Sequence, residues 1–412
     1  MAATLILEPA EKNMIRNPIW VTIETDQMSG AEPPYTIDQD NLSCVCEVWH
    51  DPLAGDPVLL GRLRAPYSTD DKRATFDIAS LVRFPELAIP SEASIGVSPS
   101  TPLGEAAPYL TRRIHLAYAD AYGTPVVTEA LTETDIYLCI DGGLPADAVQ
   151  DINWAGPLLA LHSYLYKRNS AYILRKPVSK AQPDWIYFIT QVADNVDVIV
   201  TIHYSDGTYE FYTAINNMAV VINRGYWVQA GYNQLKVDDN ANPGKTVIGY
   251  DVSLVRVTGE VNAYTQFYVV DDMCPSWERY ILYQNGMGGY ETVRMKGVTR
   301  YSHEVQRDRF ERTPWTDFDI KTGVIDEIRV RGGAVYNTHT GHYPSWYVEH
   351  LRQMMHGKMW LIDMELSDLD EYRFKRIVVD NTTVDIRSDI PAADGFALTY
   401  RHAWKDDGFN IF

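Results

Sequence analysis

The stretch Arg279–Gly297, RYILYQNGMGGYETVRMKG, decides the expected fold class. Side chains alternate in character on both sides of a glycine-rich centre, and such period-two alternation of β-branched and aromatic residues predicts strands. Asn285-Gly286 and Gly288-Gly289 supply residues that tolerate positive φ, as tight connections require. The stretch contains no nucleophile–base pair and no metal-ligand spacing, so it predicts a β-hairpin and not a catalytic motif.

Composition extends this prediction to the whole chain. At 412 residues the chain is long enough for several domains. A hydrophobic content of 46% with 22% charged residues is typical of folded protein, and the 27 Tyr and 10 Trp residues favour β-structure. The formal net charge of −19 repels phosphate backbones, so no nucleic-acid partner is expected.

The cysteines predict a reduced protein. Cys44 and Cys46 are two residues apart in an expected strand, which is unsuitable for a disulfide and does not match paired zinc-ligand spacing. Together with Cys139 and Cys274 they are expected to be buried free thiols, in keeping with assembly in a reducing cytoplasm. The N-terminus lacks the pattern of a signal peptide. The sequence has no apolar run of about 18 residues, so no membrane insertion is expected.

Turn signals divide the chain into four expected segments. Together they predict a mainly β, multidomain fold. Residues 1–140 are expected to form a β-sandwich, 141–169 a linker or transitional segment, and 170–273 a second β-sandwich. Residues 274–412 are expected to form a β-rich domain with one helix at 344–356, flanked by Pro344 in its first turn and Gly357 at its C-terminal cap.

Individual strands are expected where alternation is clearest. The proline- and serine-rich segment Ala88–Pro108 is expected to be a loop of the first sandwich that is free for contacts, and Gly332-Gly333 to end a strand. The strands expected are Ile19–Thr25, Ser43–His50, Val58–Leu63, Ala74–Ile78, Thr111–Ala119, Val126–Glu129, Trp185–Gln191, Val196–His203, Tyr209–Ala214, Tyr226–Val228, Leu235–Val237, Val247–Val257, Tyr264–Val270, Val324–Arg331, Lys358–Met364, Phe374–Val379 and Phe396–Arg401.

No catalytic, cofactor-binding or metal-binding residue is predicted. His339 and His342 lie close in sequence but lack the spacing of a zinc site, and the acidic run from Asp363 to Glu371 lacks the glycine of a calcium loop. A hydrolase would need two opposed carboxylates, and no motif singles out a pair. Aromatic residues that could stack on a sugar or a protein partner are Tyr226, Trp227, Tyr232, Trp277, Trp315 and Trp346.

Four segments together resemble minor structural (tail) proteins of phages and prophages of Bacteroidetes-type bacteria. They are Asn17–Val21, Ala74–Leu81, the hairpin stretch quoted above and Phe396–Trp404, and they occur in the expected order over nearly the whole chain. The resemblance implies fibronectin-type-III-like sandwiches and a structural role for the motif residues. These residues are Asn17, Pro18, Trp20, Asp77, Tyr283, Asn285, Gly288, Gly289, Tyr290 and Tyr400.

The expected function is therefore that of a non-enzymatic structural component of a phage tail or phage-like particle. The resemblance implies a tail tip, baseplate or collar position in the virion, with other structural proteins and further copies of the chain as partners. One alternative is a receptor- or glycan-binding protein of the particle, whose partner would be a host-surface glycan. A second alternative is a glycan hydrolase.

Overall fold

The computed structural model describes residues 3–84, 88–95, 102–144, 154, 156, 158–161, 175–258, 261–271, 278–311, 325–364, 373–380, 395 and 397–403, with backbone only at 261–263, 305–308, 310–311 and 325–332. The chain folds into two compact units. Unit 1 comprises Met1–Arg175, Asp184–Tyr268 and Asn285–Tyr290, and unit 2 comprises Lys176–Pro183, Val269–Gln284 and Glu291–Phe412. This division is coarser than the four expected segments, whose boundaries stay predictions.

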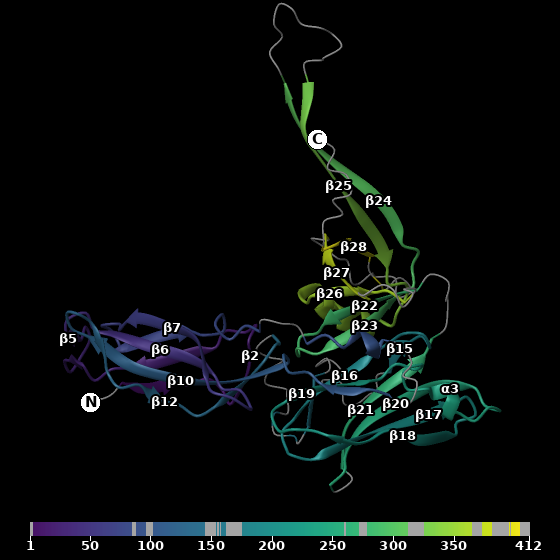
Figure 1. Cartoon of the computed structure of the whole chain (residues 1–412), viewed down its shortest axis with the longest axis horizontal. Coiled ribbons are helices and arrows are strands. Elements are labelled where there is room, and N and C mark those ends of the chain that lie inside the picture. Colours follow the sequence, from purple (N-terminus) through teal and green to yellow (C-terminus); the bar gives the residue numbers. More distant parts are fainter. Residues whose placement is uncertain are drawn as a thin grey trace, which may run out of the picture. The chain divides into compact units, whose positions relative to one another are not determined.

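The chain is mainly β, as the sequence predicts. The N-terminal part of unit 1 packs two sheets on one apolar core, to which Val21, Cys46 and Leu116 contribute. One sheet has the order β1-β3-β8 and the other β2-β13-β10-β6-β7, with β11 and β12 added to β10 (Figure 1). The strands are β1 (Thr4–Leu7), β2 (Lys12–Met14), β3 (Trp20–Glu24), β6 (Ser43–His50), β7 (Val58–Pro66), β8 (Arg73–Asp77), β10 (Thr111–Tyr122), β11 (Val127–Thr128), β12 (Thr132–Glu133) and β13 (Tyr137–Ile140), beside the short ribbon of β4 (Met28–Ser29) and β5 (Thr36–Ile37).

Two further sheets complete unit 1. One has the order β14-β16-β19-β9, and the other contains β21-β20-β17-β18, in which β18 is the last strand. Alternation of buried and half-buried residues along β17 explains why it forms a sheet with one covered face. The elements are β9 (Gly104–Ala106), β14 (Leu158–Ala160), β16 (Trp185–Thr190), β17 (Asn195–Tyr204), β18 (Tyr209–Ala219), β19 (Gly225–Gln229), β20 (Val247–Arg256) and β21 (Val261–Val270), with the short helices η1 (Glu92–Ser94) and α3 (Val237–Asn240).

The prediction that Ala88–Pro108 is a free loop of the first sandwich was wrong. Its described residues contribute β9, which pairs with β19 of another sheet. The buried Trp185 donates its indole N–H to Ser94 Oγ at 2.9 Å, and the Tyr187 hydroxyl donates to the Ala88 carbonyl at 2.7 Å. Buried aromatic side chains need partners for their polar atoms, and this segment supplies them. Likewise, Leu235–Val237 is not a strand, because the chain there turns into α3.

Unit 2 is built on a seven-stranded sheet in the order β23-β22-β26-β27-β28-β25-β24. The predicted hairpin is confirmed as β22 and β23, and the predicted helix is confirmed as α4 followed by η3, with Val348, Leu351 and Met354 in the core. The elements are β22 (Arg279–Gln284), β23 (Tyr290–Met295), β24 (Arg300–Glu311), β25 (Ile325–His339), α4 (Ser345–Leu351), η3 (Arg352–His356), β26 (Met359–Ile362), β27 (Phe374–Val379) and β28 (Ala397–His402), and unit 2 also holds β15 (Lys176–Val178).

Gly357 is the C-terminal cap of the helix, as predicted, with φ of −99°. A β-carbon at this position would lie 2.1 Å from the Gln284 carbonyl oxygen, so close backbone approach requires the glycine. Gly332-Gly333 do not end a strand: they pair with Val305 and Glu304 in the middle of β25, because the partner strand continues the hydrogen-bonded ladder there.

Candidate functional site

The tip of the β22–β23 hairpin is a tight turn built by Asn285 and Gly288. The Asn285 N–H donates to the Gly289 carbonyl at 2.9 Å, and the Gly288 N–H donates to the Asn285 carbonyl at 3.2 Å. The Asn285 side-chain oxygen accepts the Met287 N–H at 3.0 Å. In the tip, Gly288 has positive φ, at +90°, so this position needs the conformational freedom of glycine.

The backbone of this tip lies so close to other backbone segments of unit 1 that its glycines could not carry side chains. A β-carbon at Gly288 would lie 2.5 Å from the Asp141 carbonyl oxygen, and one at Gly289 would lie 2.3 Å from the Leu161 carbonyl oxygen. The Asn285 amide donates to that Leu161 carbonyl at 3.0 Å. The Gly143 N–H donates to the Gly286 carbonyl at 2.9 Å. We call this meeting of residues 16–17, 141–144, 161 and 285–290 the glycine junction.

The N-terminal motif closes the glycine junction from a third segment. The Asn17 side chain binds both backbone groups of Leu144, donating to its carbonyl at 2.8 Å and accepting its N–H at 3.1 Å. Next to it, Arg16 Nε lies 3.5 Å from Asp141 Oδ1. Segments that are far apart in sequence are thus held together by side-chain hydrogen bonds to the backbone and by an ion pair.

Tyr290 adds an aromatic contact to the glycine junction. Its ring lies 5.5 Å from that of Tyr187, centroid to centroid. Burial raises the pKa of the Tyr290 hydroxyl, and the charge of Asp141 raises it further. The phenol therefore stays protonated at neutral pH.

The structure thus brings Asn17, Asn285, Gly288, Gly289 and Tyr290 together. The remaining motif residues lie elsewhere. Asp77 Oδ1 accepts the N–H groups of Ile19 at 3.0 Å and Ala79 at 3.1 Å. Asp77 thus fixes the backbone next to β3 and β8.

Tyr283 and Tyr400 lie in the core of unit 2. The Tyr283 hydroxyl lies 3.1 Å from His350 Nε2, and this nitrogen lies 2.9 Å from Glu291 Oε2. All of these side chains are buried. Buried polar groups with hydrogen-bond partners fix the packing of a core.

Pro18, Trp20 and Asp77 are the motif residues that lie exposed. Trp20 is 51% exposed and pairs in register with Asp77 across β3 and β8. Isolated exposed hydrophobic side chains are common on protein surfaces, so Trp20 alone does not identify a contact surface.

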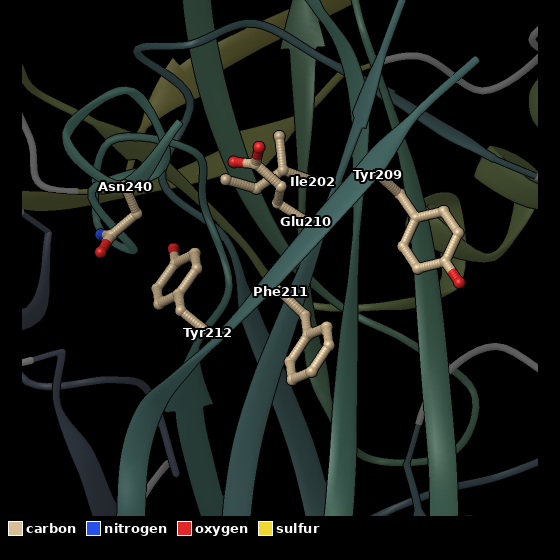
Figure 2. Close-up of a pocket in the computed structure, with 6 residues that line it drawn as sticks. All are labelled: Ile202, Tyr209, Glu210, Phe211, Tyr212 and Asn240. Carbon is tan, nitrogen blue, oxygen red and sulfur yellow. The ribbon is translucent and has the colours of Figure 1, made fainter. Parts of the chain in front are cut away.

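An open groove of about 420 Å³ lies beside β18. Figure 2 shows Tyr209 and Phe211 on one side of this strand and Tyr212 and Asn240 on the other. Tyr209 is 67% exposed and Phe211 73% exposed. The residues lining the groove are Ile202, Tyr209, Glu210, Phe211, Tyr212 and Asn240.

Hydrogen bonds position the polar side chains of this groove. Glu210 Oε2 accepts the Tyr204 hydroxyl at 2.8 Å, and the Tyr212 hydroxyl donates to the Leu235 carbonyl at 2.6 Å. Burial raises the pKa of Tyr212, and the charge of Asp239 raises it further. The groove therefore combines apolar rings with a negative rim.

The aromatic residues singled out in the sequence do not line this groove. Tyr226, Trp227 and Tyr232 are buried, and Trp346 packs against the core of unit 2. Trp277 and Trp315 lie outside the described residues. Tyr209 and Phe211 alternate with half-buried residues in an expected strand, and sequence reasoning missed them because alternation does not show which face is covered.

The histidine and acidic candidates do not converge. His339 Nδ1 accepts the Gly341 N–H at 2.8 Å, and burial lowers the pKa of His339. Among the acidic run, Asp363 Oδ2 accepts from Lys375 Nζ at 2.6 Å, whereas Glu365, Asp368, Asp370 and Glu371 lie outside the described residues. Within the described part of the chain, no group of three metal-ligating side chains is found.

The thiols of Cys44, Cys46 and Cys139 are free and buried, as predicted, whereas Cys274 lies outside the described residues. Burial raises the pKa of each of the three from 9.0 to about 12. We expect these thiols to resist Ellman's reagent at about pH 8 in the folded protein and to react once guanidinium unfolds it, because the reactive thiolate is nearly absent. Fast reaction of all cysteines in the native protein would contradict this burial.

The same pKa shifts predict how the stability of the folded protein changes with pH. Because the buried thiols have raised pKa values, their contribution to stability is complete below the unfolded-state value of 9.0 and falls as the pH rises toward about 12. The chain is therefore expected to lose stability in strong alkali.

Comparison with known proteins gives no family assignment. No protein-family model matches the sequence, and no curated protein matches it. Among the helices in the described part of the chain, none has the length and apolar character needed to cross a membrane.

Proposed function

We propose that this protein is a non-enzymatic structural component of a phage tail or phage-like particle, of the tail tip, baseplate or collar type, that acts by symmetric protein–protein association. Its partners would be other structural proteins of the virion and further copies of the chain, assembled in the host cytoplasm. In this proposal the two expected β-sandwiches of the chain are fibronectin-type-III-like. The observation that supports it most is the extended ribbon of unit 2.

This ribbon is formed by β24 and β25, which pair from Arg300↔Asn337 to Glu311↔Ile325. In contrast, β28 pairs with β25 only from Tyr336 to His339. Beyond that point, the described strands form a two-stranded ribbon (Figure 1) about 34 Å long at 3.4 Å per residue. A two-stranded ribbon alone is only marginally stable in water, so it gains from a partner.

Charge also separates the ribbon from the rest of the chain. Residues 300–339 contain seven Lys or Arg and seven Asp or Glu, whereas the whole chain has a net charge of −19. Two ribbons can therefore approach each other without net repulsion, whereas two acidic bodies repel. This balance favours the ribbon as the part through which copies associate.

Shortening the ribbon tests this role. We expect replacement of Val305–Gly332 by an Asn-Gly turn to leave the thermal unfolding midpoint nearly unchanged, because the described residues of this segment pair only with each other, beyond the point where β28 joins the sheet. Association, measured by sedimentation velocity, should be lost. A shortened chain that assembles as the intact chain does would contradict the proposed role of the ribbon.

A second candidate function is glycan binding on the particle, and the groove at β18 favours it. Exposed aromatic rings beside carboxylate and amide groups are suited to a sugar. Retention on host-surface polysaccharide that is lost in Phe211→Ser would support this candidate. Steady hydrolysis of chromogenic glycosides, abolished by one carboxylate substitution, would instead support a glycan hydrolase.

A further inference from the structure

We propose that the free edge of β18 is a docking site for an extended, basic polypeptide segment of another protein, which adds a strand to this sheet. The inference rests on the proposed function only in taking the partner to be a protein of the assembly. Three features of the molecule support docking: the free edge of β18, the residues that line the groove, and the charge of the groove's rim.

The strand order provides the first argument. β18 ends its sheet, and in the described part of the chain it pairs with β17 alone. In an antiparallel pair, alternate residues of an edge strand direct their N–H and C=O groups away from the neighbour. The segment Tyr209–Thr213 thus offers about 17 Å of edge with free main-chain groups. Such an edge is a template for strand addition.

The lining of the groove provides the second argument. Four consecutive residues, Tyr209 to Tyr212, line it, and successive residues of a strand point to opposite faces. The groove therefore involves both faces of β18, as the opposed side chains in Figure 2 illustrate, and it also reaches Ile202 of β17, the partner of Glu210. An added strand places side chains on both faces and would contact both sets, whereas a sugar stacks on one face.

The charge of the rim provides the third argument. Glu210 lies in the groove, and the exposed Asp238 and Asp239 precede Asn240 on α3. Asp239 is close enough to raise the pKa of Tyr212. Lysine and arginine side chains on the incoming segment would meet these carboxylates. A second copy of this chain, with its net charge of −19, is a poor general match.

Part of one face in the far half of β18 is covered, although Asn216, Asn217 and Ala219 are exposed there. A β-carbon at Gly104, on β9, would lie 2.9 Å from Met218 Sδ and 3.3 Å from Ile215 Cδ1. These side chains are covered from within unit 1. The proposed docking site lies along the N-terminal half of the strand, where the groove is.

The test uses the full chain and a fluorescein-labelled peptide of alternating Lys or Arg and Val or Thr. We expect saturable binding by fluorescence anisotropy and protection of the amides of residues 209–213 from hydrogen exchange. A peptide N-methylated at alternate residues should bind at least about tenfold more weakly, because it loses two or three main-chain hydrogen bonds. A peptide with Glu in place of Lys and Arg should not bind.

Matched variants locate the site. Glu210→Gln and Asp239→Asn should each weaken binding about two- to fivefold, as expected for one solvent-exposed charge pair. Asp56→Asn, which removes an exposed carboxylate beside a different sheet, should leave it unchanged.

Several results would overturn the inference. They are no peptide binding, equal binding of the N-methylated peptide, or equal effects of Asp56→Asn and Asp239→Asn. Binding of polysaccharide that the peptide does not displace, without peptide binding, would assign the groove to a glycan. Self-association that Phe211→Ser abolishes would assign it to a second copy. Apart from the self-association result, these outcomes do not bear on the ribbon, and the shortened-ribbon variant tests the proposed function separately.

Discussion

Gly288→Ala is expected to lower the free energy of unfolding by about 3–5 kcal/mol. Two costs add at this position. The φ of +90° is one that L-residues rarely adopt, and the new β-carbon would lie 2.5 Å from the Asp141 carbonyl oxygen. That oxygen belongs to the backbone of a hydrogen-bonded segment, so it cannot move aside without breaking the glycine junction.

Gly207→Ala is the matched control for this prediction. Gly207 also has positive φ, at +82°, but a β-carbon there meets nothing within 4 Å. Its cost should be only that of the backbone conformation, about 1–2 kcal/mol. Guanidinium unfolding of both variants measures the difference. Equal losses of stability would mean that Asp141 does not approach Gly288 as described.

Arg294→Met is expected to destabilise unit 2 by about 3–5 kcal/mol, because removing one member of a buried ion pair leaves the other without compensation. The Arg294 side chain is 1% exposed and pairs through Nη2 with Glu278 Oε1. It also donates through Nη1 to the Asp271 carbonyl. The Glu278 carboxylate would then stay buried without its cation.

Two variants separate the charge effect from loss of packing. Arg352→Met removes an arginine from the exposed Arg352–Glu349 pair, whose side chains are 59% and 40% exposed, and should cost less than about 1 kcal/mol. The double variant Arg294→Met with Glu278→Leu should recover part of the loss, since an apolar pair can replace a buried ion pair. Thermal and guanidinium unfolding report both. If the double variant is as unstable as Arg294→Met, lost packing rather than the unpaired Glu278 charge causes the destabilisation.

The sequence predicts the strands of this protein better than their partners. Ser43–His50, Phe374–Val379 and the hairpin at Arg279–Gly297 are strands as expected, because their alternation is strong and turn residues flank them. The role of Ala88–Pro108 could not be read locally. Its Ser94 side chain and Ala88 carbonyl are bound by Trp185 and Tyr187, about a hundred residues away in sequence.

The glycines of the hairpin also show that contacts between distant segments cannot be predicted from local sequence. The sequence marks Gly288 and Gly289 as turn residues, and positive φ is found at Gly288. The need for glycine at Gly289 arises from the Leu161 carbonyl, a contact between segments far apart in the chain. Likewise, the exposure of Tyr209 and Phe211 depends on which face of β18 is covered. Period-two alternation leaves that choice open.

The measurement that tests the central claim most directly is the mass of the purified full-length chain in solution, by size-exclusion chromatography with light scattering over a range of concentrations. Association through the ribbon predicts a closed oligomer of defined mass, which falls to the monomer when Val305–Gly332 is replaced by a short turn. A monomer at every concentration, with or without the ribbon, would contradict self-assembly as the function of this chain.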